Sequence, residues 1–277
     1  MRKSNSPPAR RRPAARGLLL ALLLAAALGA GCLGNSEARQ LADKARGMWD
    51  GGRYQDAARN FLIIAELYPS STLAEESLYW AASLYEYYIQ DAEQAIRQYQ
   101  RLIVAYPKGR FFYEAKQNLA EVYEQDKDTR HRALQIYQQL LLADDLQDRR
   151  DWLHLKIARL NLQMGKMDQA RMEVRDLLLQ NPQSPLRAQA YYLVGYSYYL
   201  EKRFDLALWS FRQLARDFPG SPTALHALYF VADTLEEQGQ MREALKAYTA
   251  LRGKYPNPDI VEKRIKTLEA RIRRGVR

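Results

Sequence analysis

The sequence has few of the residues from which metal and redox sites are built. It contains one cysteine and three histidines in 277 residues. A single cysteine excludes an internal disulfide framework and any zinc or iron–sulfur site that needs several thiolates. His131, His154 and His226 are not spaced as a zinc pair or as a dyad with a carboxylate on one helix. We therefore expect no metal and no cofactor.

The motifs of common enzyme classes are also missing. The sequence has neither a glycine-rich phosphate-binding loop nor a G-x-S-x-G element. Acidic residues are adjacent at 75–76, 144–145 and 236–237. Neighbours on a helix point about 100° apart, so these pairs cannot form the facing carboxylates of a glycosidase. The sequence predicts a protein that is not an enzyme; an enzyme accessory or a hydrolase without a recognisable motif is the alternative.

The body of the chain has no net charge, although the whole chain carries +10. Residues 1–31 contribute +6, and residues 259–277 contribute +4. The 29 basic and 29 acidic residues between them cancel. A broad footprint on nucleic acid needs clustered positive charge, so we expect no nucleic-acid partner.

The amino-terminal residues have the pattern of an export signal. Six basic residues precede the apolar run Leu18–Leu28, whose eleven residues span about 16 Å, too short to cross a membrane as a helix. Gly29-Ala30-Gly31 and then the lone Cys32 follow.

This arrangement resembles the lipobox of bacterial lipoproteins. The resemblance implies that residues 1–31 are a lipoprotein signal peptide and that Cys32 is the acylated first residue of the mature protein, with 32–36 as a short tether. Ordinary cleavage that leaves a free thiol is the alternative. Under the sorting rule that the resemblance brings in, leucine at position 33 favours the outer membrane.

A sequence motif, which we call the recurring phrase, is repeated along the chain. It consists of an alanine, three further residues and an aromatic residue, and a proline follows eight residues later. Successive alanines are 38, 38, 37, 37 and 37 residues apart. The alanine permits close approach of two helices, the aromatic residue fills the space between them, and proline ends the second helix. Glycine five residues before the alanine, at Gly52, Gly165 and Gly239, predicts a tight turn between the helices. The six occurrences, two of them variants, are Ala57/Phe61/Pro69, Ala95/Tyr99/Pro107, Ala133/Tyr137/Asp145, Ala170/Val174/Pro182, Ala207/Phe211/Pro219 and Ala244/Tyr248/Pro256.

The repeat resembles the tetratricopeptide repeat. It predicts an all-α fold, a tetratricopeptide-like helical-hairpin solenoid with about six repeats over residues 37–258. Ser184-Pro185 and Ser221-Pro222 predict an N-cap and a first-turn proline of the helix that follows each. Residues 259–277 predict a basic C-terminal capping helix, because an apolar stripe with spacings of 4, 3 and 4 runs from Val261 to Ile272.

Two surfaces are candidate binding sites. In the repeat frame, residues on the first helices line an inner groove, and tyrosine and tryptophan there favour peptide binding. The alternative is that these rings pack between helices. The groove residues are Trp49, Trp80, Tyr87, Tyr88, Asn118, Arg159, Tyr192, Tyr196 and Tyr199. A basic patch on the last helix would bind an acidic partner or an anionic membrane, or be a solvated cap without a partner; it comprises Lys263, Arg264, Lys266, Arg271, Arg273 and Arg274.

A lipobox followed by repeats of this length resembles the BamD family of outer-membrane lipoproteins. The first repeat carries this resemblance, from Gly51-Gly52-Arg53-Tyr54 to Tyr68-Pro69. The last repeat, from Ala227-Leu228-Tyr229 to Tyr255-Pro256, is equally similar to CpoB. The resemblance implies a non-catalytic scaffold that faces the periplasm and binds envelope proteins, a β-barrel assembly protein among them, and no small-molecule substrate. A lipoprotein of another envelope machine, in Tol–Pal-linked division, polysaccharide secretion or pilus assembly, is the alternative.

Overall fold

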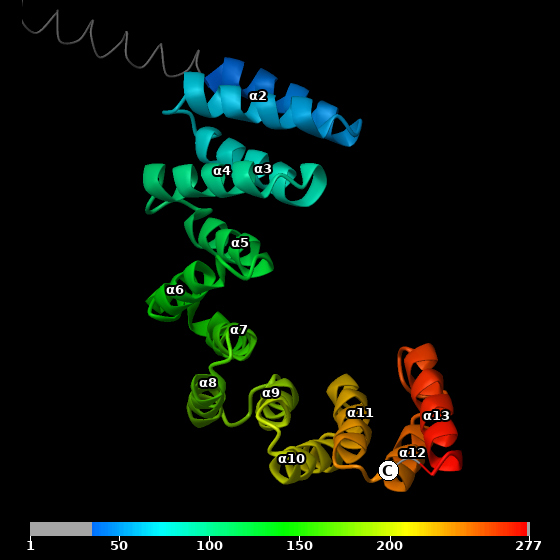
Figure 1. Ribbon diagram of the computed structural model, residues 1–277. Coiled ribbons are helices and arrows are strands. Elements are labelled where there is room, and N and C mark those ends of the chain that lie inside the picture. The colour runs from blue at the N-terminus through cyan, green and yellow to red at the C-terminus, as the bar shows by residue number, and fades with distance from the viewer. Residues whose placement is uncertain (1–34, 276–277) are drawn as a thin grey trace, which may run out of the picture. The chain divides into compact units, whose positions relative to one another are not determined.

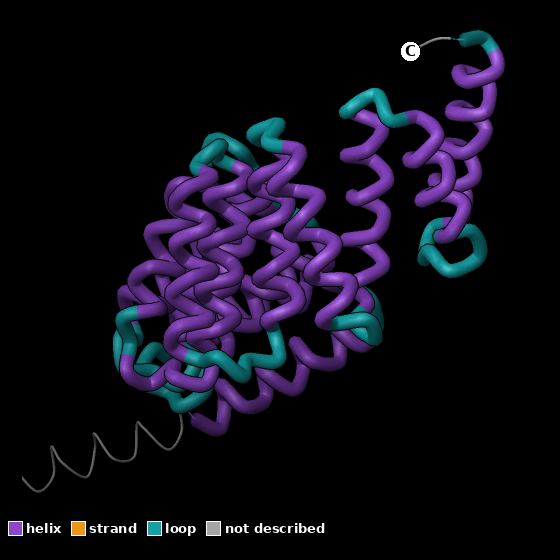
Figure 2. Tube along the Cα trace, turned by 90° about the horizontal axis from the view of Figure 1, so that it is seen from below, coloured by secondary structure: helices purple, strands orange, loops and turns teal. Residues whose placement is uncertain are grey.

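The described part of the chain is entirely helical. The structure is a computed structural model and describes residues 35–275. The predicted signal peptide and Cys32 lie outside these residues. Within them there are helices and connecting turns and no strand (Figure 2). The prediction of an all-α, tetratricopeptide-like fold is confirmed.

The chain divides into two compact units, Met1–Val122 and Tyr123–Arg277. The boundary falls within helix α5 (Phe112–Gln125), the first helix of the third predicted repeat. The described part of the first unit also contains a helix over residues 35–50, α2 (Tyr54–Leu67), α3 (Ala74–Leu84), the π-helix η1 (Tyr85–Ile89) and α4 (Ala92–Ala105). The second unit contains α6 (Arg130–Leu141), the 3₁₀ helix η2 (Asp144–Arg149), α7 (Arg150–Gln163), α8 (Met167–Gln180), α9 (Arg187–Leu200), α10 (Phe204–Asp217), α11 (Pro222–Glu237), α12 (Met241–Ala250) and α13 (Pro258–Arg273).

Helices of the second unit form antiparallel pairs in two layers. Helix α7 packs on α8, α9 on α10, and α11 on α12. The first helices of successive pairs also contact one another, since α9 touches both α7 and α11. Figure 1 shows α7, α9 and α11 along one side of this unit and α8, α10 and α12 along the other. Side chains on the first helices therefore share one continuous surface.

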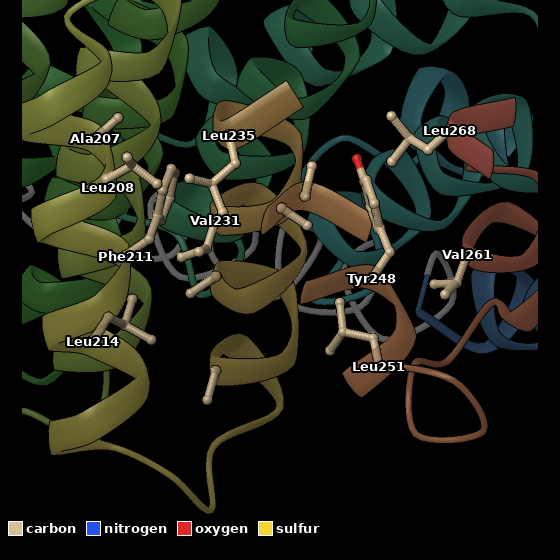
Figure 3. Close-up of a cluster of buried hydrophobic side chains, with 14 of the residues drawn as sticks. Ala207, Leu208, Phe211, Leu214, Val231, Leu235, Tyr248, Leu251, Val261 and Leu268 are labelled. Carbon is tan, nitrogen blue, oxygen red and sulfur yellow. The ribbon is translucent and has the colours of Figure 1, made fainter. Parts of the chain in front are cut away.

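The recurring phrase forms the core. All six of its alanines are buried. The bulky residue at its fifth position is buried in every repeat as well. Figure 3 shows two of these residues, Phe211 of α10 and Tyr248 of α12, among the apolar side chains of one buried cluster.

The turns between paired helices use a left-handed residue. Gly52, Gly165 and Gly239 have φ of 73°, 74° and 77°, a conformation that costs glycine little. The equivalent positions of the second and fifth repeats hold Gln90 and Lys202, with φ of 60° and 58°. The third repeat turns differently, with the Thr129 hydroxyl donating a hydrogen bond to the Tyr123 carbonyl at 2.8 Å.

Only one of the two predicted serine–proline caps begins a helix. Ser221 is the N-cap of α11, its hydroxyl accepts from the Thr223 backbone N–H at 3.2 Å, and Pro222 is the first helical residue. The prediction for Ser184 is wrong. The Ser184 hydroxyl accepts from the Leu186 N–H at 3.1 Å, within a turn, and α9 begins only at Arg187.

Candidate functional site

Three tyrosines of α9 form a ladder against one phenylalanine of α11. The rings of Tyr192, Tyr196 and Tyr199 are nearly parallel, with successive centroids 6.0 and 6.2 Å apart. Each meets the ring of Phe230 edge-on, at centroid distances of 5.8, 5.2 and 5.3 Å. Because these are favourable aromatic geometries, the ladder is a rigid platform.

A pocket of about 510 Å³ lies beside this ladder, on the surface shared by the first helices. We call it the tyrosine pocket. It brings together Arg159, Tyr192 and Tyr196 of the predicted groove. Its lining residues are Arg159, Leu162, Gln163, Tyr192, Leu193, Tyr196, Leu200 and Phe230.

Phe230 was missed by the sequence analysis, although it contacts all three tyrosines. It and Tyr229 lie 38 and 37 residues beyond Tyr192, which is one repeat length in either case. The repeat frame cannot choose between them, because the spacing itself varies between 37 and 38. The structure places Phe230 on the pocket and Tyr229 against Tyr255, with ring centroids 5.1 Å apart.

Tyr199 lies beside the pocket and is tied to a buried carboxylate. Asp233 of α11 accepts hydrogen bonds from the hydroxyl of Tyr199, from the hydroxyl of Tyr248 at 3.0 Å, and from Nη2 of Arg264 at 3.0 Å. Burial and the neighbouring Asp233 carboxylate both raise the pKa of Tyr199. This phenol therefore stays protonated, and its hydroxyl holds helices together instead of facing a ligand.

The residues of the predicted basic patch fall into two groups, those paired with acids of α11 and those that are exposed. Arg264 pairs with Asp233 and Glu236, and Arg271 pairs with Glu236 at 3.0 Å, so both hold α13 against α11. Arg273 lies 3.9 Å from Glu269 on the same helix. The exposed members are Lys263, Lys266, Arg273 and Arg274.

The aromatic residues of the first unit pack against one another. Trp49 contacts Trp80 and Tyr88 at centroid distances of 5.3 and 5.8 Å, and Tyr88 lies 4.5 Å from Tyr54. We call these four residues the tryptophan cluster. Glu76 lies beside it and accepts a hydrogen bond from the Trp80 indole N–H at 3.0 Å. The cluster contains three of the predicted groove residues and is bordered by a carboxylate.

Two other predicted groove residues lie elsewhere in the first unit. Tyr87 is 55% exposed on η1, outside the tryptophan cluster. Asn118 is buried on α5, where its amide group donates to the hydroxyls of Tyr99 at 3.0 Å and Tyr79 at 3.4 Å. Asn118 thus satisfies polar atoms inside the unit, as the packing interpretation expects.

A carboxylate accompanies each buried tyrosine of the recurring phrase. The hydroxyl of Tyr99 donates to Glu86 at 2.7 Å, and that of Tyr137 donates to Glu124 at 3.0 Å. The hydroxyl of Tyr248 likewise donates a hydrogen bond to Asp233. The three acids lie 13 or 15 residues before their tyrosines, on η1, α5 and α11. The pairing satisfies a hydroxyl that would otherwise be buried without a partner.

Two histidines of the second unit contact polar groups of the same unit. His154 is buried, with Nδ1 2.8 Å from a carboxylate oxygen of Glu173, and Nδ1 of His226 lies 3.1 Å from the Tyr255 hydroxyl. Among residues 35–275 no three histidine, cysteine or acidic side chains gather closely enough to hold a metal ion. None of the helices over the same residues combines the length and apolarity needed to cross a bilayer.

Comparison with known proteins identifies the repeats. A tetratricopeptide-repeat model matches residues 155–222, and a second one matches residues 76–109 and 226–258. No curated protein sequence matches the chain significantly.

Several solved structures share the fold at low sequence identity. A tetratricopeptide-repeat protein from Parabacteroides merdae is 16% identical, with a TM-score of 0.61 over 85% of this chain and 93% of its own. The type IV pilus biogenesis factor PilW is 15% identical, with a TM-score of 0.55 over 84% of this chain and 99% of its own. PilF of Pseudomonas aeruginosa is 18% identical, with a TM-score of 0.52 over 86% and 99%. The chain therefore contains tetratricopeptide repeats in both units and has the all-helical fold of tetratricopeptide-repeat proteins.

Proposed function

We propose that this chain is a non-catalytic scaffold lipoprotein of the bacterial outer membrane that faces the periplasm and binds partner proteins through the tyrosine pocket. The pocket itself is the observation that carries the proposal. It lies on the surface shared by α7, α9 and α11, and it is lined by rings that are only partly buried against the repeat core.

The chemistry of the pocket suits a protein segment. Tyrosine and phenylalanine offer large contact areas at low entropic cost, since few of their bonds rotate. The ladder against Phe230 fixes the rings before a partner arrives, so binding orders few side chains. A pocket of about 510 Å³ has room for more than one side chain of a bound segment.

Assembly of β-barrel outer-membrane proteins is the leading system. It rests on the resemblance of the first repeat and of the lipobox to the BamD family. Type IV pilus biogenesis is the second candidate, because PilW and PilF each align over 99% of their own length. Tol–Pal-linked division and polysaccharide secretion are further outcomes that the experiment below distinguishes.

Crosslinking in native membranes tests the partner. A photo-crosslinking amino acid replaces Tyr196 in the pocket, and a matched control places it at the exposed Arg242 on α12. A β-barrel assembly protein captured from position 196 alone supports the leading system. A pilus biogenesis protein captured there supports the second, and equal capture from both positions rejects the pocket as the binding site.

Labelling of Cys32 tests the anchor independently. Cells fed an alkyne fatty acid should label the wild-type chain, and Cys32→Ser should remove the label and release the chain from membranes. More than one acyl chain gives stable anchoring, because each buried methylene contributes about 0.8 kcal/mol. Unlabelled wild-type chain would reject the lipoprotein assignment and leave the binding surface unaffected.

A further inference from the structure

The tyrosine pocket contains a positive charge without a partner. Arg159 of α7 is exposed and lines the pocket, and within the described residues it makes no hydrogen bond or ion pair. Several other arginines of the second unit pair with acids. Arg171 pairs with Glu201 at 3.0 Å, and Arg264 pairs with Asp233 at the same distance. The guanidinium of Arg159 is therefore free to meet a charge from outside the chain.

Two phenol groups stand next to this arginine. Tyr192 and Tyr196 line the same pocket, and their hydroxyls make no hydrogen bond within residues 35–275. Burial raises the pKa of Tyr192, so its hydroxyl stays protonated at neutral pH and remains available as a donor. A guanidinium has five N–H donors in a planar fork that fits a carboxylate. Arginine and phenol together supply donors for an anion and no strong acceptor.

Apart from the Gln163 amide, the rest of the pocket is apolar. Leu162, Leu193 and Phe230 lie along its lining with the tyrosine rings. A cavity of about 150 Å³ is enough to hold benzene, so the volume of about 510 Å³ here leaves space for an apolar side chain beside the charged group.

We propose that the tyrosine pocket recognises a partner segment in which an aspartate or glutamate side chain stands directly beside a large apolar side chain. Arg159 binds the carboxylate with help from the phenols, and the leucines and Phe230 contact the apolar group. This inference rests on the proposed function and specifies the chemistry of its partner.

The first unit shows why this preference belongs to one surface. Its tryptophan cluster is bordered by Glu76, which pairs with Arg46 at 3.4 Å, and the pocket beside Tyr54 and Tyr88 contains Asp56 as well as Arg53. An acidic segment would meet carboxylates beside that pocket, whereas the lining of the tyrosine pocket contains Arg159 and no acid. Charge complementarity therefore selects the second unit for an acidic partner.

Selection and affinity measurements test the inference on the full chain in detergent. Random twelve-residue peptides are selected on the chain and then synthesised with acetylated and amidated ends, so that no terminal carboxylate remains. We expect enrichment of aspartate or glutamate next to leucine or an aromatic residue. Changing that glutamate to glutamine should weaken binding about tenfold to a hundredfold, the range for a hydrogen bond to a charged group.

Variants of the chain separate charge from packing. Arg159→Gln should remove the preference for glutamate over glutamine, and Arg242→Gln on the exposed face of α12 should leave it unchanged. Circular dichroism should show the same helicity in both, because both residues are exposed.

Three results would overturn the inference. They are equal affinity for glutamate and glutamine peptides, a glutamate preference that survives Arg159→Gln, and binding only of peptides with a free carboxyl end. Binding that ignores charge but is lost in Tyr196→Ala would refute the acidic partner and leave the proposed function standing. Selection of no peptide at all would count against both.

Discussion

The two units place aromatic residues on their first helices and use them differently. In the first unit, Trp49, Trp80 and Tyr88 contact one another, and a carboxylate borders the cluster. In the second, Tyr192 and Tyr196 stack along one helix and border a pocket with an unpaired arginine. The repeat phrase fixes the buried alanine and its bulky partner in both units. It leaves the exposed positions of the first helices unconstrained, so one fold presents surfaces with different charged groups.

The largest expected effect tests whether the units are independent. Phe211→Ala removes a fully buried ring from the core of the second unit and should cost about 3–5 kcal/mol of unfolding free energy. Hydrogen exchange should accelerate in α9–α12 and stay unchanged in α2–α4. Equal acceleration in both sets of helices would show that the units unfold as one.

A smaller effect is expected where two helices of the second unit approach closely. A Cβ at Gly195 of α9 would lie 2.8 Å from two ring carbons of Phe211. Gly195→Ala should therefore destabilise the second unit by about 1–3 kcal/mol, because the ring must move. Gly220→Ala is the matched control, since its Cβ would meet no atom within 4 Å. Thermal unfolding of both variants measures the difference, and equal melting temperatures would contradict the close approach.

In each unit, one turn between paired helices should become more stable when its left-handed residue is replaced by glycine. Gln90 and Lys202 hold left-handed backbone conformations that other repeats assign to glycine. Gln90→Gly and Lys202→Gly should each stabilise their own unit by about 0.5–1 kcal/mol, because the strain of a side chain at positive φ is removed. Gly165→Ala should have the opposite sign. Denaturant unfolding checks all three, and destabilisation by Lys202→Gly would show that its side chain makes a stronger contribution than the strain.

The smallest expected effect is a pH dependence confined to the first unit. Burial raises the pKa of Glu86 above its ordinary value, despite the hydrogen bond from Tyr99 that opposes the shift. A raised folded-state pKa favours the protonated acid, so this contribution to stability is full below the unfolded pKa and is lost as the pH rises through the folded pKa.

The substitution Glu86→Gln isolates that group. It should raise the melting temperature of the first unit at pH 7 relative to the wild type and have less effect at pH 4. A larger stabilisation at pH 4 than at pH 7 would reverse the assigned direction.

Much of the fold follows from local patterns in the sequence. The spacing of alanine, aromatic residue and proline predicts the helix pairs, because each residue type acts within one repeat. The left-handed turns at Gln90 and Lys202 escape prediction, since neither residue type favours that conformation. Helix α9 begins later than its serine–proline pair suggests, because the serine hydroxyl closes a turn first.

The candidate site is less predictable because it depends on contacts between repeats. The sequence places Arg159, Tyr192 and Tyr196 on first helices, and the structure brings them to one pocket. The sequence alone cannot show that the Asn118 amide donates a hydrogen bond to the Tyr99 hydroxyl, or that Arg264 and Arg271 form ion pairs with acids of α11. Each of those pairings joins residues from different helices, and their geometry depends on how the helices stack.

The buried carboxylate of Asp233 sets a condition on any change to the carboxyl-terminal part of the chain. It receives donors from α9, α12 and α13, so removing α13 would leave its charge without the Arg264 guanidinium. A repeat grafted in place of α13 must therefore provide a cation opposite Asp233 as well as an apolar face. A repeat added to this array must therefore place a positive charge opposite the Asp233 carboxylate. Where the added repeat has no such cation, Asp233→Asn would remove the unpaired negative charge.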